Sequence, residues 1–200
     1  MKKVLLSILR DKNTDIKKFR QTAQELAYLL ACETGNLLEK ENININTPID
    51  KTTGTKFKND IVFVPILRAA LSLLPPFLDF FKYAKVGFLG LRRDEKTAIA
   101  NLYYKNLPEI KKTDDVIILD PMIATGGSGI KAIEILKEVG VLEKKIIFVA
   151  IICSKIGVDE IKAKFPKVKL IYVEQDENLS STKFIVPGLG DFGDRFFGTV

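Results

Sequence analysis

The sequence contains no histidine, and this absence excludes several kinds of active site. Without histidine the chain cannot form a Ser-His-Asp or Cys-His catalytic group, and it cannot form an HExxH zinc site. Any proton transfer must therefore use carboxylate, lysine or tyrosine side chains, or groups of the substrate itself.

Cysteine is scarce, and long apolar runs are absent. Cys32 and Cys153 form no CxxC pair, which favours a reduced, cytoplasmic setting. No apolar run approaches the ~20 residues that a membrane-spanning helix needs. The apolar stretch within residues 1–10 is too short for the core of a signal peptide. We therefore expect a cytoplasmic protein that does not associate with a membrane.

The net charge is +6, which is compatible with nucleic acid or with a phosphate-rich ligand. The lysines are spread along the chain and form no cluster with aromatic residues, so nucleic acid is the less favoured partner. Arginine binds phosphate better than lysine because its planar group donates two parallel hydrogen bonds. Four of the six arginines lie in, or directly beside, the motif stretches described below, namely Arg68, Arg92, Arg93 and Arg195.

The order of the apolar segments predicts an α/β fold. Two hundred residues with 46% hydrophobic content suit one globular domain. Strands are expected at residues 61–65, 85–89, 116–119, 145–152 and 169–173. Helices are expected at residues 14–33, 69–74, 130–137 and 157–165. Pro75-Pro76 should disrupt the helix that starts at 69–74. The helices at 130–137 and 157–165 alternate with the strands. Residues 43–58 predict a hairpin. Alternating strands and helices indicate a parallel sheet that is covered on both faces.

The most informative stretch runs from Val116 to Lys137. An apolar strand ends at Asp120, a Thr-Gly-Gly-Ser turn follows at 125–128, and a helix pattern begins at Ile130. Free amides at the start of a helix, together with the helix dipole, favour an anion. The pieces fit a ribose phosphate, with Asp120 on the ribose and the turn on the phosphate. The alternative is an ordinary strand-turn-helix joint with a capping serine. The lysine of a nucleotide P-loop and the glycine spacing of a dinucleotide site are both missing.

Residues 120–128 read Asp-Pro-Met-Ile-Ala-Thr-Gly-Gly-Ser, and this stretch closely resembles the loop that binds 5-phosphoribosyl diphosphate (PRPP) in uracil phosphoribosyltransferases. Three further stretches resemble the same family in the expected order, at residues 64–69, 93–97 and 187–195. The resemblance extends from about Phe19 to Thr199.

The resemblance implies a type I phosphoribosyltransferase fold, a parallel sheet flanked by helices with a small added hood. It implies one domain over residues 1–200, with hood elements at about 1–58 and a tail at 180–200. The implied enzyme transfers the phosphoribosyl group of PRPP to uracil, giving UMP and diphosphate. The implied cofactor is Mg²⁺, carried mainly by PRPP, with no metal ligands on the protein. A homodimer or higher oligomer is expected, and GTP is a candidate activator.

The resemblance also assigns residues to the site. The implied catalytic residues are Arg68, Arg93 and Asp191. The implied PRPP-binding residues are Arg68, Arg93, Asp120, Pro121, Met122, Ile123, Ala124, Thr125, Gly126, Gly127, Ser128 and Asp191. The implied uracil-binding residues are Ile185, Gly190, Asp191 and Phe192. Residues 103–108 are similar to the family's mobile segment, although less closely.

Three places depart from the family pattern. Phe192 stands where the family has alanine, and its ring either narrows the base pocket or points outward; we expect the outward orientation. Ala70 replaces a usual glycine. Ser154-Lys155-Ile156-Gly157 replaces the usual Ala-Pro-Glu-Gly.

Two other functions stay open at this point. One is a uridine-nucleotide-sensing, RNA-binding regulator of pyrimidine genes, a role that proteins of this fold also serve. The other is a degenerate homologue that binds ligand without turnover, which the changes at Ala70 and Phe192 suggest. For the oligomer, the apolar stripe of Phe19, Leu26 and Leu30 on the first long helix is the expected interface.

Overall fold

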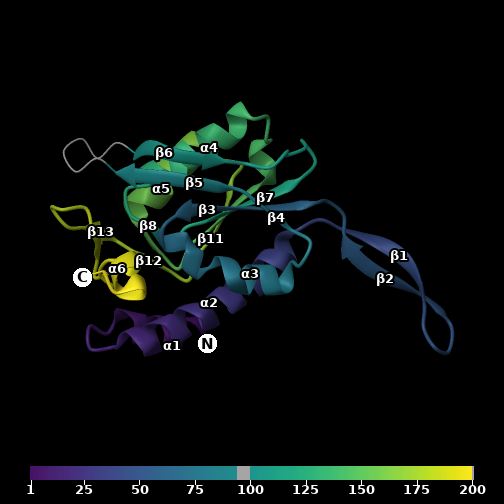
Figure 1. The fold of residues 1–200 in the computed structure, drawn as a ribbon, viewed down its shortest axis with the longest axis horizontal. Helices are drawn as coiled ribbons and strands as arrows, with labels where there is room; N and C mark the ends of the chain where they lie inside the picture. The colour runs from purple at the N-terminus through teal and green to yellow at the C-terminus, as the bar shows by residue number, and fades with distance from the viewer. Residues whose placement is uncertain (94–99, 200) are drawn as a thin grey trace.

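The computed structural model of the protein describes residues 1–93 and 100–199. One main sheet forms the centre of the molecule (Figure 1). Its strand order is β11 (Lys169–Ile171), β9 (Ile146–Val149), β7 (Asp115–Leu119), β3 (Ile61–Leu67), β5 (Phe88–Arg93) and β6 (Ala100–Asn106), with β4 (Lys85–Val86) paired to β3. All the pairings are parallel except that of β5 with β6. The predicted α/β class and parallel sheet are confirmed.

Helices cover both faces of this sheet, because successive side chains of each strand point to opposite sides. In β7, Ile117 and Leu119 belong to one buried cluster, and Val116 and Ile118 belong to the other. The first cluster includes side chains of α1 (Lys2–Arg10), α2 (Ile16–Leu37) and α3 (Leu74–Phe80). The second includes side chains of α4 (Gly127–Glu138) and α5 (Lys155–Lys164), on the opposite side of the sheet (Figure 1).

A second, smaller parallel sheet continues three of these strands. Its order is β12 (Glu174–Asp176), β10 (Ile152–Ser154) and β8 (Met122–Ile123). β12 follows β11 along the chain, β10 follows β9 and β8 follows β7. The three short strands therefore end side by side at one edge. That edge brings together residues 124, 154 and 176, which are far apart in the sequence.

The remaining elements lie outside the sheets or at their ends. β1 (Lys40–Asn46) and β2 (Lys51–Phe57) form the predicted hairpin, which projects away from the rest of the molecule (Figure 1). The others are η1 (Ala69–Ser72), η2 (Glu143–Lys145), β13 (Asn178–Leu179), β14 (Ile185–Val186) and α6 (Phe192–Phe197). The hood assignment of residues 1–58 and 180–200 stays a prediction.

One local expectation is corrected. Pro75 and Pro76 do not disrupt a helix: they occupy the first turn of α3, where proline's missing N–H costs nothing. Residues 103–106, the first part of the segment that is similar to the family's mobile segment, lie in the edge strand β6, and the mobile role of this segment stays a prediction.

The stripe expected to form an oligomer interface is also corrected. Phe19, Leu26 and Leu30 are each 0% exposed within the single chain, where α2 packs against α1, α3 and the sheet. A partner cannot cover side chains that the chain itself has already buried. Any interface between copies must therefore use other residues.

Phe192 does not point outward. Its side chain is 1% exposed and belongs to the buried cluster beneath α2. The ring meets Phe19 edge-on, with 5.2 Å between centroids, and stacks with Phe196 at 6.0 Å. The aromatic ring therefore anchors α6 to α2.

We predict that Phe192→Ala lowers the free energy of unfolding by about 3–5 kcal/mol, because it leaves a cavity between α6 and α2. The measurement is chemical denaturation followed by circular dichroism. Phe184→Ala is the matched control, since Phe184 is 45% exposed and its removal should cost less than about 1 kcal/mol. Equal losses for the two variants would contradict the anchoring role.

Candidate functional site

The middle of the main sheet contains a topological switch point. From β7 the chain continues to β9 on one side, and from β3 it continues to β5 on the other. In open α/β sheets, ligands bind in the crevice at the carboxyl ends of two such strands. Here Asp120 follows β7 and Arg68 follows β3, while the backbone of Arg93 ends β5. The topology therefore brings three predicted site residues to one edge.

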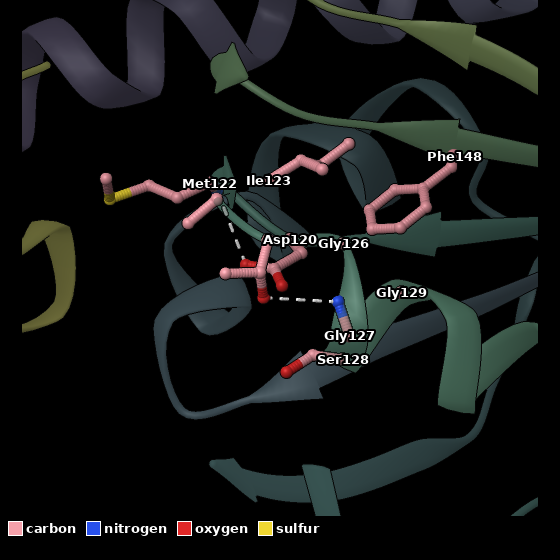
Figure 2. Close-up of a pocket in the computed structure, with 10 residues that line it drawn as sticks. Asp120, Met122, Ile123, Gly126, Gly127, Ser128, Gly129 and Phe148 are labelled. Atoms are coloured by element: carbon pink, nitrogen blue, oxygen red, sulfur yellow. Dashed lines mark hydrogen bonds between the residues drawn. The ribbon is translucent and has the colours of Figure 1, made fainter. Parts of the chain in front are cut away.

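A pocket lies at this edge, directly beyond β7 (Figure 2). Every residue of the predicted PRPP loop lines it except Pro121. Pro121 is buried, and its carbonyl accepts hydrogen bonds from the N–H groups of Ile151 and Ile152. The pocket is lined by Asp120, Met122, Ile123, Ala124, Thr125, Gly126, Gly127, Ser128, Gly129 and Phe148.

The turn leads directly into α4. Gly126 is the N-cap residue and has φ of 81°, in the left-handed region that favours glycine. The first amides of α4, beginning at Gly127, have no carbonyl one turn earlier to bind. Gly127 N–H has only a long contact of 3.5 Å to the Thr125 hydroxyl. The turn therefore presents several N–H donors and the positive end of a helix dipole to the pocket.

The start of α5 holds this turn from behind. The Ser154 hydroxyl donates to the Ala124 carbonyl and accepts from the Gly157 N–H at 2.9 Å. A Cβ on Gly157 would lie 2.4 Å from the Ala124 oxygen, so only glycine allows this approach. Because a trans peptide is planar, holding the Ala124 carbonyl turns the Thr125 N–H the opposite way. Within the described part of the chain, that N–H has no acceptor.

Asp120 is the acidic group of the pocket. Its carboxylate accepts a hydrogen bond of 3.4 Å from the Met122 N–H, drawn as a dashed line in Figure 2. The residue keeps partial contact with solvent, yet protein atoms surround the carboxylate. This burial raises the pKa of Asp120 to about 7, and the Met122 N–H offsets only part of the increase. A ligand that donates hydroxyl hydrogens would favour the ionised form.

The two predicted diphosphate ligands differ in how far they are described. The Arg68 side chain is exposed and makes no ion pair or hydrogen bond with the residues that the structure covers. For Arg93 only the backbone is described, and residues 94–97 of its motif lie outside the described ranges. Ala70 is buried in η1, two residues beyond Arg68.

The predicted base-reading residues lie on the tail. Ile185 is buried in β14, while Gly190 is exposed, with φ of 81°. Asp191 caps α6, its carboxylate accepting from the Asp194 N–H at 2.9 Å. The Phe192 ring is committed to the core, so only its backbone is free to face a ligand.

Sequence reasoning singled out Arg195 as a phosphate candidate and overlooked Arg10 and Asp176. The Arg195 guanidinium instead donates to the carbonyls of Leu9, Asp11 and Leu189. Arg10 pairs with Asp176, 166 residues further along the chain. No local pattern marks these contacts, because they join the two ends of the sequence. Ser154 lies three residues before the helix expected at 157–165, and serine there is a typical helix-capping signal.

The donor set at the pocket suits a metal ion that a phosphate ligand brings with it. Among residues 1–93 and 100–199, no group of three acidic, cysteine or histidine side chains could hold a metal ion. Asp120 is the one carboxylate that lines the pocket. Mg²⁺ prefers phosphate oxygens and water, so these residues fit an ion carried by a diphosphate. Within the same described residues, no helix is both long enough and apolar enough to span a bilayer.

Comparison with known proteins places the chain in a family. It is 42% identical to a uracil phosphoribosyltransferase of Campylobacter fetus over 195 residues, covering 98% of this chain and 92% of that protein. Identity to the enzyme of Finegoldia magna is 45%, covering 97% and 92%. The solved structure of the AQ2163 protein from Aquifex aeolicus matches with a TM-score of 0.90 and 37% identity, covering 98% and 93%.

More distant structures share the fold alone. A hypoxanthine phosphoribosyltransferase from Staphylococcus aureus matches with a TM-score of 0.53 and 12% identity, covering 80% of this chain and 76% of its own. The family model described as uracil phosphoribosyltransferase matches residues 1–199. With the pocket at the end of β7, its glycine turn and these relatives taken together, the chain belongs to the uracil phosphoribosyltransferase family.

Proposed function

We propose that this protein transfers the phosphoribosyl group of PRPP to uracil, forming UMP and diphosphate. The observation that carries the proposal is the pocket beyond β7, where one acidic side chain lies beside a turn of free amides. The amides suit the 5′-phosphate, and Asp120 suits the ribose hydroxyls. The curated relatives that bear this activity in their names support the choice of uracil.

In the reaction, a bond forms between uracil N1 and the anomeric carbon of the ribose, and the bond from that carbon to the diphosphate oxygen breaks. The N1 proton is lost, and the diphosphate leaves with the bonding electrons. Arg68 and Arg93 would stabilise the negative charge that builds on the leaving group. Asp191 would reach PRPP through the carboxylate oxygen that the cap of α6 does not use.

The base would be read by the tail. Uracil's imide edge alternates acceptor, donor and acceptor, and backbone groups of Ile185, Gly190 and Phe192 can match that order. Because uracil N1 is weakly acidic, holding the two substrates in line contributes more than a strong base would. A mechanism that relies on positioning and not on a strong base suits a chain without histidine.

Mg²⁺ would be bound mainly by the diphosphate, whose charge it would neutralise. A cytoplasmic homodimer or higher oligomer and GTP as an activator complete the proposal.

The direct test is a panel of bases incubated with PRPP and Mg²⁺, with diphosphate release followed in each case. Uracil should support release, and cytosine, hypoxanthine and orotate should not. Absence of release with every base, despite PRPP binding, would identify a homologue without turnover.

The pKa of Asp120 leads to a prediction on pH. Since hydroxyl donors favour the ionised carboxylate, PRPP affinity should rise with pH up to about 7 and then level off. At one pH unit below the pKa, affinity should be up to about tenfold weaker. Titration calorimetry between pH 5.5 and 8 measures this dependence and the proton released on binding.

Asp120→Asn is the matched variant for that experiment. It should bind PRPP more weakly at pH 8 and should lose the pH dependence attributed to the carboxylate. The folded-state pKa lies above the ordinary value of 3.8, so ionisation costs folding stability as pH rises from about 4 to 7. The ligand-free variant should therefore be at least as stable as the wild type at pH 8. A folded variant with unchanged PRPP affinity would refute the role.

A further prediction concerns Ser154→Ala. This variant loses the donor to the Ala124 carbonyl, and the KM for PRPP should rise about fivefold, while the KM for uracil stays unchanged. Asp15→Ala is the control, because Asp15 caps α2 in the same way and does not line the pocket. If both variants change the KM for PRPP equally, the contact does not organise the turn.

A further inference from the structure

Two arginines cross between the end of α1 and the C-terminal tail. Arg10, the last residue of α1, donates through NH2 to Asp176 Oδ1 at 2.6 Å and through NH1 to Asp176 Oδ2 at 2.8 Å. This is the two-pronged geometry in which arginine binds a carboxylate most strongly. Asp176 ends β12 and is 7% exposed, so solvent screens the pair little. Burial opposes its charge, yet Arg10 and the Gly188 N–H hold the pKa of Asp176 below its ordinary value.

Gly188 in the tail completes this network. Its N–H donates to Asp176 Oδ2 at 2.8 Å, and its carbonyl accepts from Arg10 NH1 at 2.8 Å. Both polar groups of its backbone are therefore taken by the same ion pair. Gly188 has φ of 58°, and a Cβ there would lie 2.1 Å from the Ile185 oxygen. Any other residue would force this turn to move.

Arg195 acts in the opposite direction, from α6 back to α1. Its guanidinium donates to the Leu189 carbonyl at 2.7 Å and to the Asp11 carbonyl at 2.7 Å, and it also donates to the Leu9 carbonyl. It lies over the Phe19 ring, with 4.4 Å to the centroid. The carbonyls at the end of α1 lack partners within the helix and favour a cation.

These contacts fix two successive carbonyls of the tail, those of Gly188 and Leu189, toward the protein interior. Since the Leu189–Gly190 peptide is planar, its N–H points away from Arg195. No group in residues 1–93 or 100–199 accepts from this Gly190 N–H. Gly188 and Leu189 are buried, whereas Gly190 and Asp191 are exposed. The buried residues Gly188 and Leu189 are therefore fixed, and they support the exposed residues Gly190 and Asp191, where the Gly190 N–H is a free donor.

We propose that Arg10, Asp176 and Arg195 form a clasp that positions the tail for base recognition. The three side chains are positioning residues, and this inference rests on the proposed function, in which the tail reads uracil. The clasp would keep the turn in its binding conformation before the base arrives. If loss of the clasp leaves only a fraction of the molecules in that conformation, the apparent affinity for the base falls by the same fraction. Binding at the phosphate turn, residues 125–128, is unaffected.

The test compares Asp176→Asn and Arg10→Lys with the wild type. Asparagine places an amide where three N–H donors now meet a carboxylate, and lysine keeps the charge but loses the two-pronged geometry. Loss of such charge-assisted bonds should raise the KM for uracil about tenfold or more. The KM for PRPP should rise less than the KM for uracil, because Asp191 is the one proposed PRPP ligand on this turn. The kcat at saturating uracil should change less than about twofold, and Arg10→Lys should be affected less than Asp176→Asn.

Glu174→Gln is the matched control. Glu174 pairs with Lys3 at 2.8 Å and so joins the same helix to the same strand without touching Gly188. Its loss should leave both KM values unchanged. A fall in melting temperature without a change in the KM for uracil, in either clasp variant, would overturn the proposal. A wild type that releases no diphosphate with uracil would instead overturn the proposed function.

One measurement on the wild type needs no variant. The Gly188 amide should exchange with deuterium at least about a thousandfold more slowly than in an unfolded peptide, as expected of a group in a stable unit. Exchange at the unfolded rate would show that the turn opens freely, and it would refute the clasp even if both variants failed to fold.

Discussion

The parallel pairing of β3 with β7 is the constraint on which the rest of the structure depends. Both strands are buried on both faces, and their register sets Pro65 opposite Leu119. The residues that follow them are therefore neighbours whatever the intervening loops do. Arg68 and Asp120 lie at one edge because hydrogen bonding between two apolar strands puts them there. The later strands repeat the arrangement, which adds Ser154 and Asp176 to the same edge.

Burial has opposite consequences at the two acids of this edge. Asp176 is compensated by a guanidinium and an amide, so its charge is retained and used to fix the backbone. Asp120 has a single weak donor, and its pKa rises toward neutrality. The protein thus gives one carboxylate strong donors and leaves the other with a single weak one. The ionised form of Asp120 is therefore disfavoured in the empty protein, and a ligand that supplies donors would favour it.

Much of this could be predicted from the sequence, because the strands and the phosphate turn are local. The run from Val116 to Ile118 and the glycines after Thr125 occupy one short stretch, and their structure follows from periodicity and turn chemistry. The orientation of Phe192 could not be predicted, because it depends on Phe19, which lies 173 residues earlier. For the same reason the α2 stripe suggested an interface: periodicity shows that a helix has an apolar face, but not which part of the molecule covers it.

Because of the clasp, the phosphate turn and the base-reading turn at residues 187–191 depend on contacts over very different lengths of chain. The phosphate turn, and the Ser154 and Gly157 contacts that hold it, all lie within residues 120–157, so this part of the site can form once β7, α4 and the start of α5 have met. The base-reading turn needs contacts between Arg10 and Gly188, whose closure spans nearly the whole chain and is entropically the most demanding. We infer an order of assembly during folding in which the anion site precedes the base site. Until the tail has met α1, the protein would be a phosphate-binding fold without a preference for any base.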